Sequence, residues 1–397
     1  GRRQRQMFIR DRSTKLYLQT IDGKFALKKV PAFEIDKNYE DTAALFIDIE
    51  NDGDLDIFIV SGGNEFTEYS SLYADRLYIN DGLGNYERNE QEVLNSFTES
   101  GKTIAGFDYN NDGFTDIIVG NRIKPQNYPR FAPSKMYKNN KGTLEDVTKE
   151  VFPELEDFGI INDILITDFN GDNQKDVIAL GEWTKIGFFQ NNDGIFNEQK
   201  EQGFSNEKGW WDTIIETDVY NDGKPDYLVG NVGENFKFKA SKKKPLKVYA
   251  NDFDDNNTPD IVLSTKYNGE FVPIRGRECS SQQMPFIKTK FKTYNEFANA
   301  KLVDVYGDKL ETAYENEVTT FSSILLLNKG NGNFSVNKLP FSAQSFPILT
   351  VVFKDLNNDG YEDCILGGNI YETEVETPRL DHISGVVLLS NQEDGYK

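Results

Sequence analysis

The sequence predicts an all-β protein made of repeated four-stranded sheets, and three observations support this prediction. An acidic nonapeptide recurs six times along the 397 residues. Each copy lies between apolar runs of strand length, such as 44–47 and 57–60 around the first copy. A second recurring segment, built around a polar glycine turn, lies between the acidic copies. Self-similarity of this kind indicates one repeat architecture rather than several unrelated domains.

The acidic copies have the composition of a calcium-binding loop. They read D-I-E-N-D-G-D-L-D (48–56), D-Y-N-N-D-G-F-T-D (108–116), D-F-N-G-D-N-Q-K-D (168–176), D-V-Y-N-D-G-K-P-D (218–226), D-F-D-D-N-N-T-P-D (252–260) and D-L-N-N-D-G-Y-E-D (355–363). Oxygen-bearing side chains stand at positions 1, 3, 5 and 9, and Gly or Asn at position 6 permits a tight turn that brings the carbonyl at position 7 into the shell. The pattern resembles the first half of an EF-hand loop, without the later Glu and the flanking helices. A lone copy reads as an Asp/Asn-rich turn, whereas six copies in matching contexts favour up to six calcium sites.

The expected metal ligands follow from the loop positions. At positions 1, 3, 5 and 9 they are Asp48, Glu50, Asp52, Asp56, Asp108, Asn110, Asp112, Asp116, Asp168, Asn170, Asp172, Asp176, Asp218, Asp222, Asp226, Asp252, Asp254, Asn256, Asp260, Asp355, Asn357, Asp359 and Asp363. At position 7 they are the backbone carbonyls of Asp54, Phe114, Gln174, Lys224, Thr258 and Tyr361. Tyr220 replaces the oxygen ligand at position 3 of the fourth copy, so we expect this site to be the weakest. Asn173 and Asn257 replace the glycine at position 6, which the left-handed preference of Asn tolerates.

The negative charge of the chain is concentrated in these loops. They hold 22 of the 65 acidic residues and only Lys175 and Lys224 among the basic ones, which accounts for −20 of the net charge of −21. Charge concentrated in this way indicates divalent counter-ions rather than a generally acidic surface. Nucleic acid is excluded as a partner because no basic face is available for phosphates. The cluster 242–244 of three lysines reads as a solvated loop.

The apolar runs, the first residues and the cysteines bear on where the protein is located in the cell. No run of about 18 apolar residues exists, so we expect no membrane-spanning helix. The basic start, 1–5, lacks an apolar segment after it, and we expect the chain to be a processed part of a longer protein. Two routes to membrane association stay open: through a partner, or through a lipidated N-terminus that precedes this chain. Cys279 and Cys364 fit no zinc spacing, and a disulfide between them stays open. Calcium sites of this kind bind at roughly 0.1–1 mM, which favours an extracellular location.

The second recurring segment predicts β-hairpins between the acidic loops. Its copies cover 16–25, 77–86, 136–144, 188–196 and 325–334, with a partial copy at 386–396. The acidic loops start 60, 60, 50, 34 and 103 positions apart, a period typical of propeller blades. We therefore expect a single β-propeller domain over 1–397 with seven four-stranded blades, six being the alternative. The short spacing places Asp252 on the outer hairpin of the Asp218 blade, or else a blade near 300–325 has lost its loop.

One region departs from the repeat. Within an irregular insertion at 264–307, Ile287, Phe291, Tyr294 and Ala298 recur at helical spacing. This pattern predicts one short amphipathic helix near 285–305. Packing on the flank of the propeller is the favoured role, and binding of a partner is the alternative.

The loops resemble the FG-GAP or VCBS repeats of integrin-α-like propellers. Further segments are similar to bacterial proteins that combine such repeats with an ASPIC/UnbV module, relatives of cartilage acidic protein: G-G-N-E-F (62–66), D-R-L-Y-I-N-D-G (75–82), N-Y-P-R-F-A-P-S (127–134), P-I-R-G-R-E (273–278) and E-V-E-T-P-R-L-D (374–381). The resemblance covers nearly the whole chain and implies the propeller fold and bound calcium. It implies little about function, because propellers host many unrelated activities. No ASPIC/UnbV segment is visible.

Catalytic motifs are missing from the sequence. His382 is the single histidine, which argues against a His-centred triad or a multi-histidine metal site. We therefore predict a protein that is not an enzyme and has no catalytic residues. The alternative is a calcium-dependent polysaccharide lyase, in which calcium neutralises a uronate and Arg275, Arg277 or Lys288 removes a proton.

A binding surface is expected at the end of the sheets away from the acidic loops. If each acidic loop joins the first two strands of a blade, the segment after the second strand emerges at the opposite end. These segments start alike, at 62–64, 120–122, 181–183 and 367–369, and are rich in Tyr, Arg and Glu. The candidate ligand-binding residues, which include the arginines of 273–278, are Glu65, Tyr69, Tyr73, Arg122, Tyr128, Arg130, Trp183, Arg275, Arg277, Tyr371 and Arg379. We predict a calcium-stabilised binding or scaffold module for a protein or glycan at a bacterial outer-membrane surface.

Overall fold

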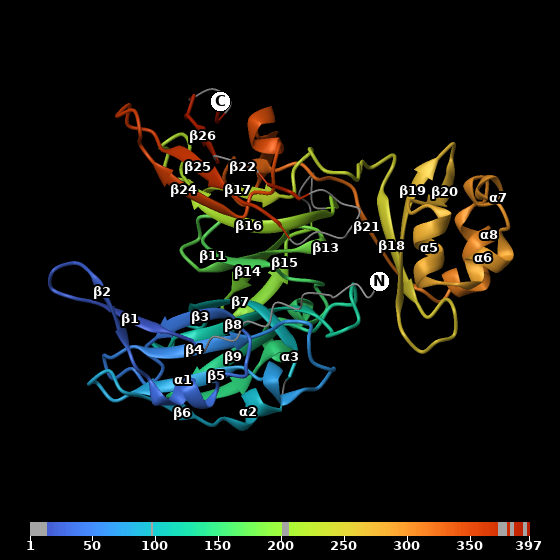
Figure 1. The fold of residues 1–397 in the computed structure, drawn as a ribbon. Helices are drawn as coiled ribbons and strands as arrows, with labels where there is room; N and C mark the ends of the chain where they lie inside the picture. The colour runs from blue at the N-terminus through green and yellow to red at the C-terminus, as the bar shows by residue number, and fades with distance from the viewer. Residues whose placement is uncertain (1–13, 97, 201–205, 372–378, 382–384, 392–394) are drawn as a thin grey trace. The chain divides into compact units, whose positions relative to one another are not determined.

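The computed structural model describes residues 14–96, 98–200, 206–371, 379–381, 385–391 and 395–397. His382 lies outside the described residues. The fold is predominantly antiparallel β, as predicted (Figure 1). None of the helices in the described part of the chain is long and apolar enough to cross a bilayer. Cys279 and Cys364 are both free thiols, so the disulfide left open by the sequence is not formed.

The chain divides into two compact units. The first comprises residues 1–126 and 132–156. Its hairpin consists of β1 (Leu16–Gln19) and β2 (Phe25–Lys28). Its first meander sheet contains β3 (Asp41–Ile47), β4 (Asp56–Ser61), β5 (Arg76–Asn80) and β6 (Tyr86–Asn89). Its second meander sheet contains β7 (Ser100–Phe107), β8 (Asp116–Ile123), β9 (Lys135–Asn140) and β10 (Thr143–Asp146). The short helices are α1 (Pro31–Ile35), η1 (Ser71–Tyr73), α2 (Glu92–Asn95), α3 (Thr148–Val151) and α4 (Pro153–Glu156).

The second unit comprises residues 127–131 and 157–397. Its first sheet is β11 (Asp163–Thr167), β12 (Asp176–Leu180), β14 (Gly187–Asn192) and β15 (Ile195–Glu198). Its second is β16 (Gly209–Thr217), β17 (Asp226–Asn231), β22 (Ile324–Asn328) and β23 (Phe334–Lys338), with β13 (Glu182–Thr184) at the β16 edge. A third sheet contains β24 (Thr350–Lys354), β25 (Asp363–Gly367) and β26 (Val386–Leu388), after the short helix η3 (Phe341–Gln344).

The second strand is fully buried in three of the five repeating sheets. All residues of β4, β12 and β17 are buried, because neighbouring strands cover both edges and side chains pack on both faces. Aliphatic and aromatic side chains of these strands form the cores of the two units. The predicted hairpins appear as β1–β2, β5–β6, β9–β10, β14–β15 and β22–β23, which confirms the second recurring segment as a hairpin.

An inserted sheet explains the uneven spacing of the acidic loops. β17 pairs with β22, although residues 232–323 lie between them in the sequence. This stretch forms its own sheet, in the order β20 (Glu270–Pro273), β19 (Asp260–Tyr267), β18 (Leu246–Asn251), β21 (Tyr314–Val318). Asp252 therefore belongs to an insertion within the Asp218 sheet, and not to its outer hairpin. Leaving out 232–323 reduces the 137 positions between Asp218 and Asp355 to 45, close to the earlier spacings.

The single helix expected near 285–305 is wrong in its extent. The insertion carries α5 (Arg277–Gln283), α6 (Phe286–Lys290), α7 (Tyr294–Ala298), α8 (Leu302–Tyr306) and η2 (Gly307–Leu310), which Figure 1 shows gathered beside β19 and β20. Thr293 accepts from the Glu296 amide and Glu296 accepts from the Thr293 amide, so this capping box starts a new helix after α6. Ile287 is buried, whereas Tyr294 is 65% exposed.

The number of blades stays a prediction. Among the described residues, five sheets show the repeating order of strands, and the inserted sheet and the β1–β2 hairpin stand apart from it. The closed ring of seven or six blades over 1–397 is therefore an expectation that goes beyond these sheets.

Candidate metal centres and ligand loops

The six acidic loops occupy equivalent places in their sheets. Five of them join the first strand of a repeating sheet to the second, as β3 to β4 and β7 to β8. The loop 252–260 joins β18 to β19 in the inserted sheet. Since each loop closes a hairpin of two paired strands, both ends of the nonapeptide are held by a β-ladder. The segment after each second strand emerges at the other end of the sheet, as the sequence predicted.

Backbone amides give every loop the same shape. The carboxylate at position 1 accepts hydrogen bonds from the amides of positions 5 and 6, for example Asp108 from Asp112 at 3.0 Å and from Gly113 at 2.8 Å. The same pair of bonds forms at Asp48, Asp168, Asp218, Asp252 and Asp355. Position 6 has a positive φ in each loop, at Gly53, Gly113, Asn173, Gly223, Asn257 and Gly360, which explains the choice of Gly or Asn.

The Asp at position 9 ties the loop to the sheet. One oxygen of Asp116 accepts from the Tyr109 amide at 3.2 Å, and the other accepts from the Asn139 amide at the end of β9 at 2.7 Å. The equivalent residues Asp56, Asp176, Asp226 and Asp363 bond in the same way. Burial raises the pKa of Asp116 and Asp226 to about 6 and that of Asp176 to about 7, against the opposing effect of these amides. Each oxygen keeps a second lone pair, so a position-9 carboxylate remains available to a cation.

An asparagine that was not among the residues predicted from the sequence connects successive loops. The Asn139 side chain donates at 2.8 Å to the carbonyl of Ile49 in the preceding acidic loop of the first unit. In the second unit, the Asn328 side chain donates at 3.0 Å to the carbonyl of Phe169. The signal was present, since Asn follows the apolar run in the hairpin segments at Asn80, Asn139, Asn191 and Asn328.

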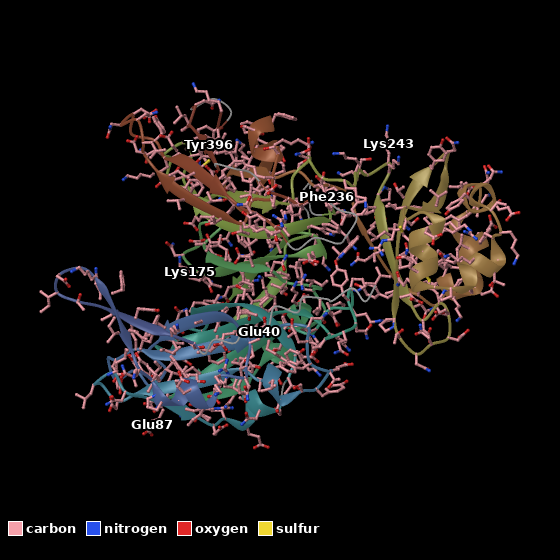
Figure 2. The ribbon with its side chains drawn as sticks, in the orientation of Figure 1. Glu40, Glu87, Lys175, Phe236, Lys243 and Tyr396 are labelled. Carbon is pink, nitrogen blue, oxygen red and sulfur yellow. The ribbon has the colours of Figure 1, made fainter. Side chains whose placement is uncertain are left out.

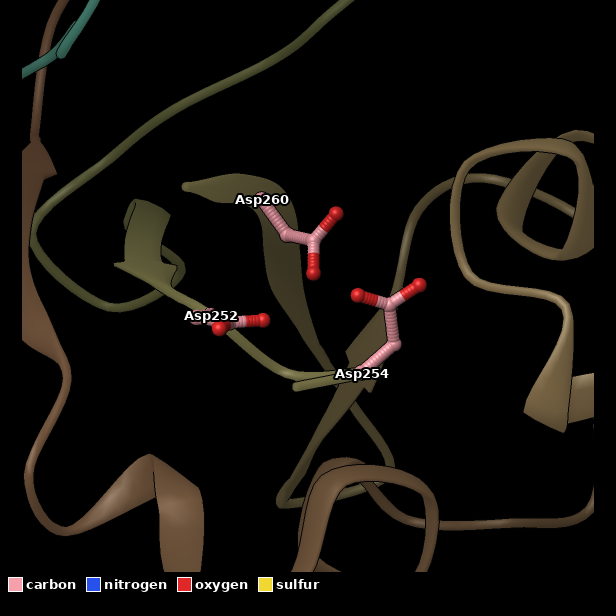
Figure 3. Close-up of side chains that lie close together, drawn as sticks. All are labelled: Asp252, Asp254 and Asp260. Atoms are coloured by element: carbon pink, nitrogen blue, oxygen red, sulfur yellow. The ribbon is translucent and has the colours of Figure 1, made fainter. Parts of the chain in front are cut away.

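The loop 252–260 brings carboxylates together in the manner of a cation site. Ligand oxygens of Asp252, Asp254 and Asp260 lie within 4.8 Å of one another (Figure 3). Oδ1 of Asp254 is enclosed and has no hydrogen-bond partner among the described residues. An enclosed carboxylate oxygen without a donor is costly unless a cation compensates it. These residues, with the amide-shaped turn around them, therefore fit a hard divalent cation such as Ca²⁺.

The first loop carries the strongest repulsion between like charges. Five carboxylates stand at positions 1, 3, 5, 7 and 9 of 48–56. Partial burial and the neighbouring carboxylates raise the pKa of Glu50 and of Asp54. A divalent cation would lower this repulsion, because it favours the charged form of every carboxylate around it.

The fourth loop contains a cation of its own. Tyr220 packs against the hydrophobic core beside Val219 and so places no oxygen at position 3. Nζ of Lys224 lies 2.6 Å from Oδ2 of Asp222, and this ammonium lowers the pKa of Asp222. The loop 218–226 thus offers one oxygen side chain fewer and holds one positive charge more than the first loop, and its rank as the weakest site stays a prediction.

The family comparison identifies these loops. A family model of the FG-GAP-like repeat matches residues 48–119 and 168–229. The chain contains FG-GAP-like repeats. Each matched stretch begins at the first residue of an acidic loop and ends within a second strand, at β8 and at β17. The resemblance of the loops to FG-GAP repeats is thereby confirmed, while the similarity to ASPIC/UnbV-type proteins stays a prediction. No curated protein matches the sequence.

Two solved structures show distant similarity to the whole chain. One is an Agrocybe aegerita lectin that recognises non-reducing terminal N-acetylglucosamine, 15% identical, with 94% of this chain and 84% of that chain covered and a TM-score of 0.36. The other is the V. cholerae biofilm matrix protein Bap1, 13% identical, with 91% and 70% covered and a TM-score of 0.29. At these TM-scores neither structure assigns a fold or a ligand to this chain.

In the first unit, the predicted ligand residues separate into exposed and structural ones. Tyr69 is 73% exposed and Glu65 is exposed, while Arg122 in β8 is partly buried. Tyr73 is 1% exposed, and its hydroxyl bonds both the amide and the carbonyl of Phe66 at 3.0 Å. The prediction of Tyr73 as a ligand contact is therefore wrong, because this side chain holds the loop after β4 in shape.

In the second unit, Trp183 is likewise structural. It is 1% exposed, and its indole nitrogen donates to the Tyr128 hydroxyl at 2.7 Å, which in turn donates to Glu182 at 2.9 Å. Trp183 thus fastens the loop after β12 and offers no surface to a ligand, which corrects its prediction as a contact. The Arg130 guanidinium lies 5.5 Å from the ring centre of Tyr314 in β21 and remains partly exposed.

The arginines of the insertion serve its own packing. Nε of Arg277 donates to the Phe291 carbonyl at 2.8 Å, and its guanidinium lies 5.3 Å from the ring centre of Tyr294. Lys288 pairs with Glu278 at 2.8 Å and lowers the pKa of that carboxyl. Arg275 lies just before α5 and is partly buried. Lys288 and Arg277 thus already hold partners within the insertion, whereas the lyase alternative requires a basic side chain that is free to remove a proton from the substrate.

Tyr371 and Arg379 form an exposed pair after β25. Tyr371 is 56% exposed, and the Arg379 guanidinium lies 5.8 Å from its ring centre. Neither side chain contributes to the cores of the unit. Together with Tyr69, this pair therefore remains available as a predicted ligand contact.

Proposed function

We propose that the protein is a calcium-stabilised binding module of the β-propeller type, which recognises a protein or a glycan at a bacterial cell surface and has no catalytic role. One observation carries the proposal: an acidic loop of constant hydrogen bonding closes the same end of every repeating sheet. This arrangement supports the proposal that cations bind at one end of the sheets. The opposite end is free to vary in sequence, as recognition loops on a rigid scaffold do.

Calcium is supported by ligand chemistry rather than by loop shape alone. The loops offer carboxylate, amide and carbonyl oxygens, which are the ligands of hard cations. The enclosed Oδ1 of Asp254 and the mutual repulsion in 48–56 both call for positive charge. Extracellular calcium modules bind with dissociation constants of about 10⁻⁴–10⁻³ M, and we therefore place the protein outside the cell, at the outer-membrane surface.

Recognition is supported by what lies at the opposite end. Tyr69, Tyr371 and Arg379 are exposed on segments that follow second strands. Large aromatic and arginine side chains supply most of the binding energy in protein interfaces. Tyr73 holds the segment that carries Tyr69 from beneath, through hydrogen bonds with the backbone of Phe66, so the exposed Tyr69 side chain sits on a fastened loop.

The proposal is tested by capture experiments with the full chain. The immobilised protein is offered cell-envelope extract and a panel of neutral and acidic glycans, in millimolar calcium and again in excess chelator. We expect selective retention of a partner or glycan in calcium and its loss in chelator. Retention that is indifferent to calcium would count against the proposal. Sustained release of unsaturated uronates from any acidic glycan would replace it with the lyase alternative.

A further inference from the structure

A cavity of about 470 Å³ lies beside the inserted sheet, within the second unit. Its walls come from the link between β17 and β18, the link between β21 and β22, and the end of β23. The acidic loop 218–226 joins the other ends of β16 and β17, so the cavity opens at the end of the sheet away from the metal loops. None of its lining residues belongs to the ligand contacts predicted from the sequence. Its volume is within the range of roughly 300–1,000 Å³ that small-ligand sites occupy.

Hydrogen bonds hold the walls of this cavity in place. The Gly233 amide donates to the Phe321 carbonyl at 2.9 Å, and the Glu234 amide donates to the Gln344 carbonyl at 2.7 Å. Gly233 has a φ of +88°, and a side chain there would collide with the Gln344 carbonyl, so the approach of these two segments requires glycine. The Ser322 hydroxyl donates to the Glu234 carboxylate at 2.6 Å. The cavity is therefore preorganised, which lowers the entropic cost of binding.

The lining combines hydroxyl groups with aromatic rings. Hydroxyls come from Ser241, Thr319, Thr320 and Ser322, and rings come from Phe238 and Phe321. The Phe321 ring is fixed from behind, with its centre 5.3 Å from those of Trp210 and Phe236. Phe236 is labelled in Figure 2 on the link that leaves β17. Several hydroxyls around an apolar ring match the alternating polar edges and apolar faces of a sugar.

Three lysines line the cavity: Lys239, Lys242 and, from β23, Lys338. The first two belong to the segment 237–244, which carries five lysines in eight residues. Two carboxylates line the cavity, and each is already paired: Glu207 with Lys242 at 2.9 Å and Glu234 with Lys338 at 2.7 Å. In the described part of the chain, Lys243 and Lys244 pair with no carboxylate (Figure 2 labels Lys243). This is a local positive surface on a chain of net charge −21, and not only the solvated loop that the sequence suggested.

We infer that this cavity binds the acidic end of a glycan, with a carboxylate or sulfate group held by Lys239 and Lys338 and a sugar ring placed against Phe238 and Phe321. The inference rests on the proposed function and gives it a site and a ligand class. A short acidic peptide is the other ligand that the lysines would attract. The glycan is favoured because hydroxyl groups and aromatic rings line the cavity. A peptide would more commonly pair its backbone with an exposed strand edge.

The experiment measures binding of three probes to the full chain by titration calorimetry in millimolar calcium. Trigalacturonate is the acidic saccharide, trigalactose is its neutral counterpart, and hexaglutamate is the acidic peptide. We expect trigalacturonate to bind at least ten times more tightly than either of the others, with an affinity that falls as salt rises. A sulfated trigalactose distinguishes the two acidic groups, and both acids are compatible with the site.

Variants locate the binding. The double change Lys239→Gln, Lys338→Gln should weaken trigalacturonate binding at least ten-fold, since it removes two charge-assisted contacts. Lys239→Gln alone leaves the Lys338–Glu234 pair intact and should act in the same direction. Lys329→Gln, an exposed lysine at the opposite end of the same hairpin, is the matched control and should bind as the parent does. Unchanged melting temperatures in calcium establish that the variants are folded.

Three results would overturn the inference. They are equal binding of trigalactose and trigalacturonate, preference for hexaglutamate, and unchanged affinity in the double variant. Each of these leaves the calcium-dependent capture experiment untouched, so failure of the cavity and failure of the proposed function are separate results.

Discussion

The side-chain amide of Asn328 donates a hydrogen bond to the carbonyl of Phe169, which lies 159 positions earlier in the sequence. The backbone amide of Asn328 meanwhile donates to Asp226, the last residue of the acidic loop in its own sheet. One residue therefore joins position 9 of one loop to position 2 of the loop before it. Asn139 makes the same two connections, to Asp116 and to Ile49. Loops that are separate in sequence are thus coupled through an asparagine that is not among the predicted metal ligands.

Replacement of this asparagine should destabilise the protein. Asn328→Ala removes side-chain bonds to the carbonyls of Phe169 and Pro225 and to the Gly330 amide, and leaves a buried carbonyl without its donor. We expect a loss of about 2–4 kcal/mol in the free energy of unfolding, at about 1 kcal/mol per bond. Denaturant unfolding in calcium measures it. Asn333→Ala in the exposed turn of the same hairpin is the control, and equal losses in the two variants would contradict the coupling role.

Removal of calcium should lower stability by a large amount. At free calcium of ten times the dissociation constant, each site contributes roughly 1.4 kcal/mol, and six sites together contribute on the order of 8 kcal/mol. This amount is comparable with the whole stability of a typical domain. Thermal melting in millimolar calcium and in excess chelator checks the expectation. Superimposable melting curves would show that the loops hold no calcium.

The second and fourth loops should differ in their response to calcium. Asp112→Ala removes a ligand from a loop with a complete set of oxygens. Asp222→Ala acts on a loop that lacks an oxygen at Tyr220 and already holds the Lys224 ammonium. We therefore expect Asp112→Ala to cost more of the calcium-dependent stability than Asp222→Ala. Calorimetry at matched calcium concentrations decides, and equal losses would contradict the ligand assignment at position 3.

Asp75 should make stability fall as pH rises. It is buried, with one oxygen accepting from the Ser61 amide at 2.9 Å, and burial raises its pKa to about 7 from 3.8. A carboxyl whose pKa is higher in the folded state stabilises the fold fully below its unfolded pKa and loses that contribution as pH rises towards 7. The difference amounts to about 4 kcal/mol at pH 8, from 1.36 kcal/mol per pKa unit.

Asp75→Asn tests this dependence. Relative to the parent, the variant should gain stability progressively between pH 4 and pH 7 and keep the gain at pH 8. Asp81→Asn is the contrasting control, because hydrogen bonds from Asn85 and its neighbours lower the pKa of Asp81, and its neutralisation should not stabilise the protein at high pH. Free energies of unfolding measured across this range, at constant calcium, provide the comparison. A flat difference profile for Asp75→Asn would refute the assignment.

The exposed pair after β25 should contribute to recognition but not to folding. Tyr371→Ala with Arg379→Ala removes side chains that lie outside the cores. We expect at least ten-fold weaker capture of the partner or glycan and an unchanged calcium-dependent melting curve. Tyr267→Ala is the matched control, since Tyr267 is 63% exposed on the inserted sheet. Equal capture by the double variant and the parent would move the recognition surface elsewhere.

Local patterns predicted the elements of this protein well, but not the way they are joined. Alternating apolar residues around glycine turns identified the hairpins, because strand pairing across a tight turn is decided within about ten residues. The pairing of β17 with β22 could not be read in this way, since 92 residues separate the two strands. The prediction of a single helix near 285–305 was wrong because the capping box at Thr293 and Glu296 starts a new helix there, although apolar residues continue at helical spacing on both sides of it.

The sequence by itself determined the acidic loops and their common turn, because each loop is built from one nonapeptide, while their calcium ligands and the weakness of the fourth site stay predictions. Tertiary structure decided what surrounds them. It buried Tyr73 and Trp183, which as sequence looked like ligand contacts, and it assembled a lysine-rimmed cavity from segments near 207, 234–242, 319–322 and 338. The physical reason is distance along the chain: the oxygens of one loop are brought together by a single turn, whereas burial and cavities depend on which remote segments pack against each other.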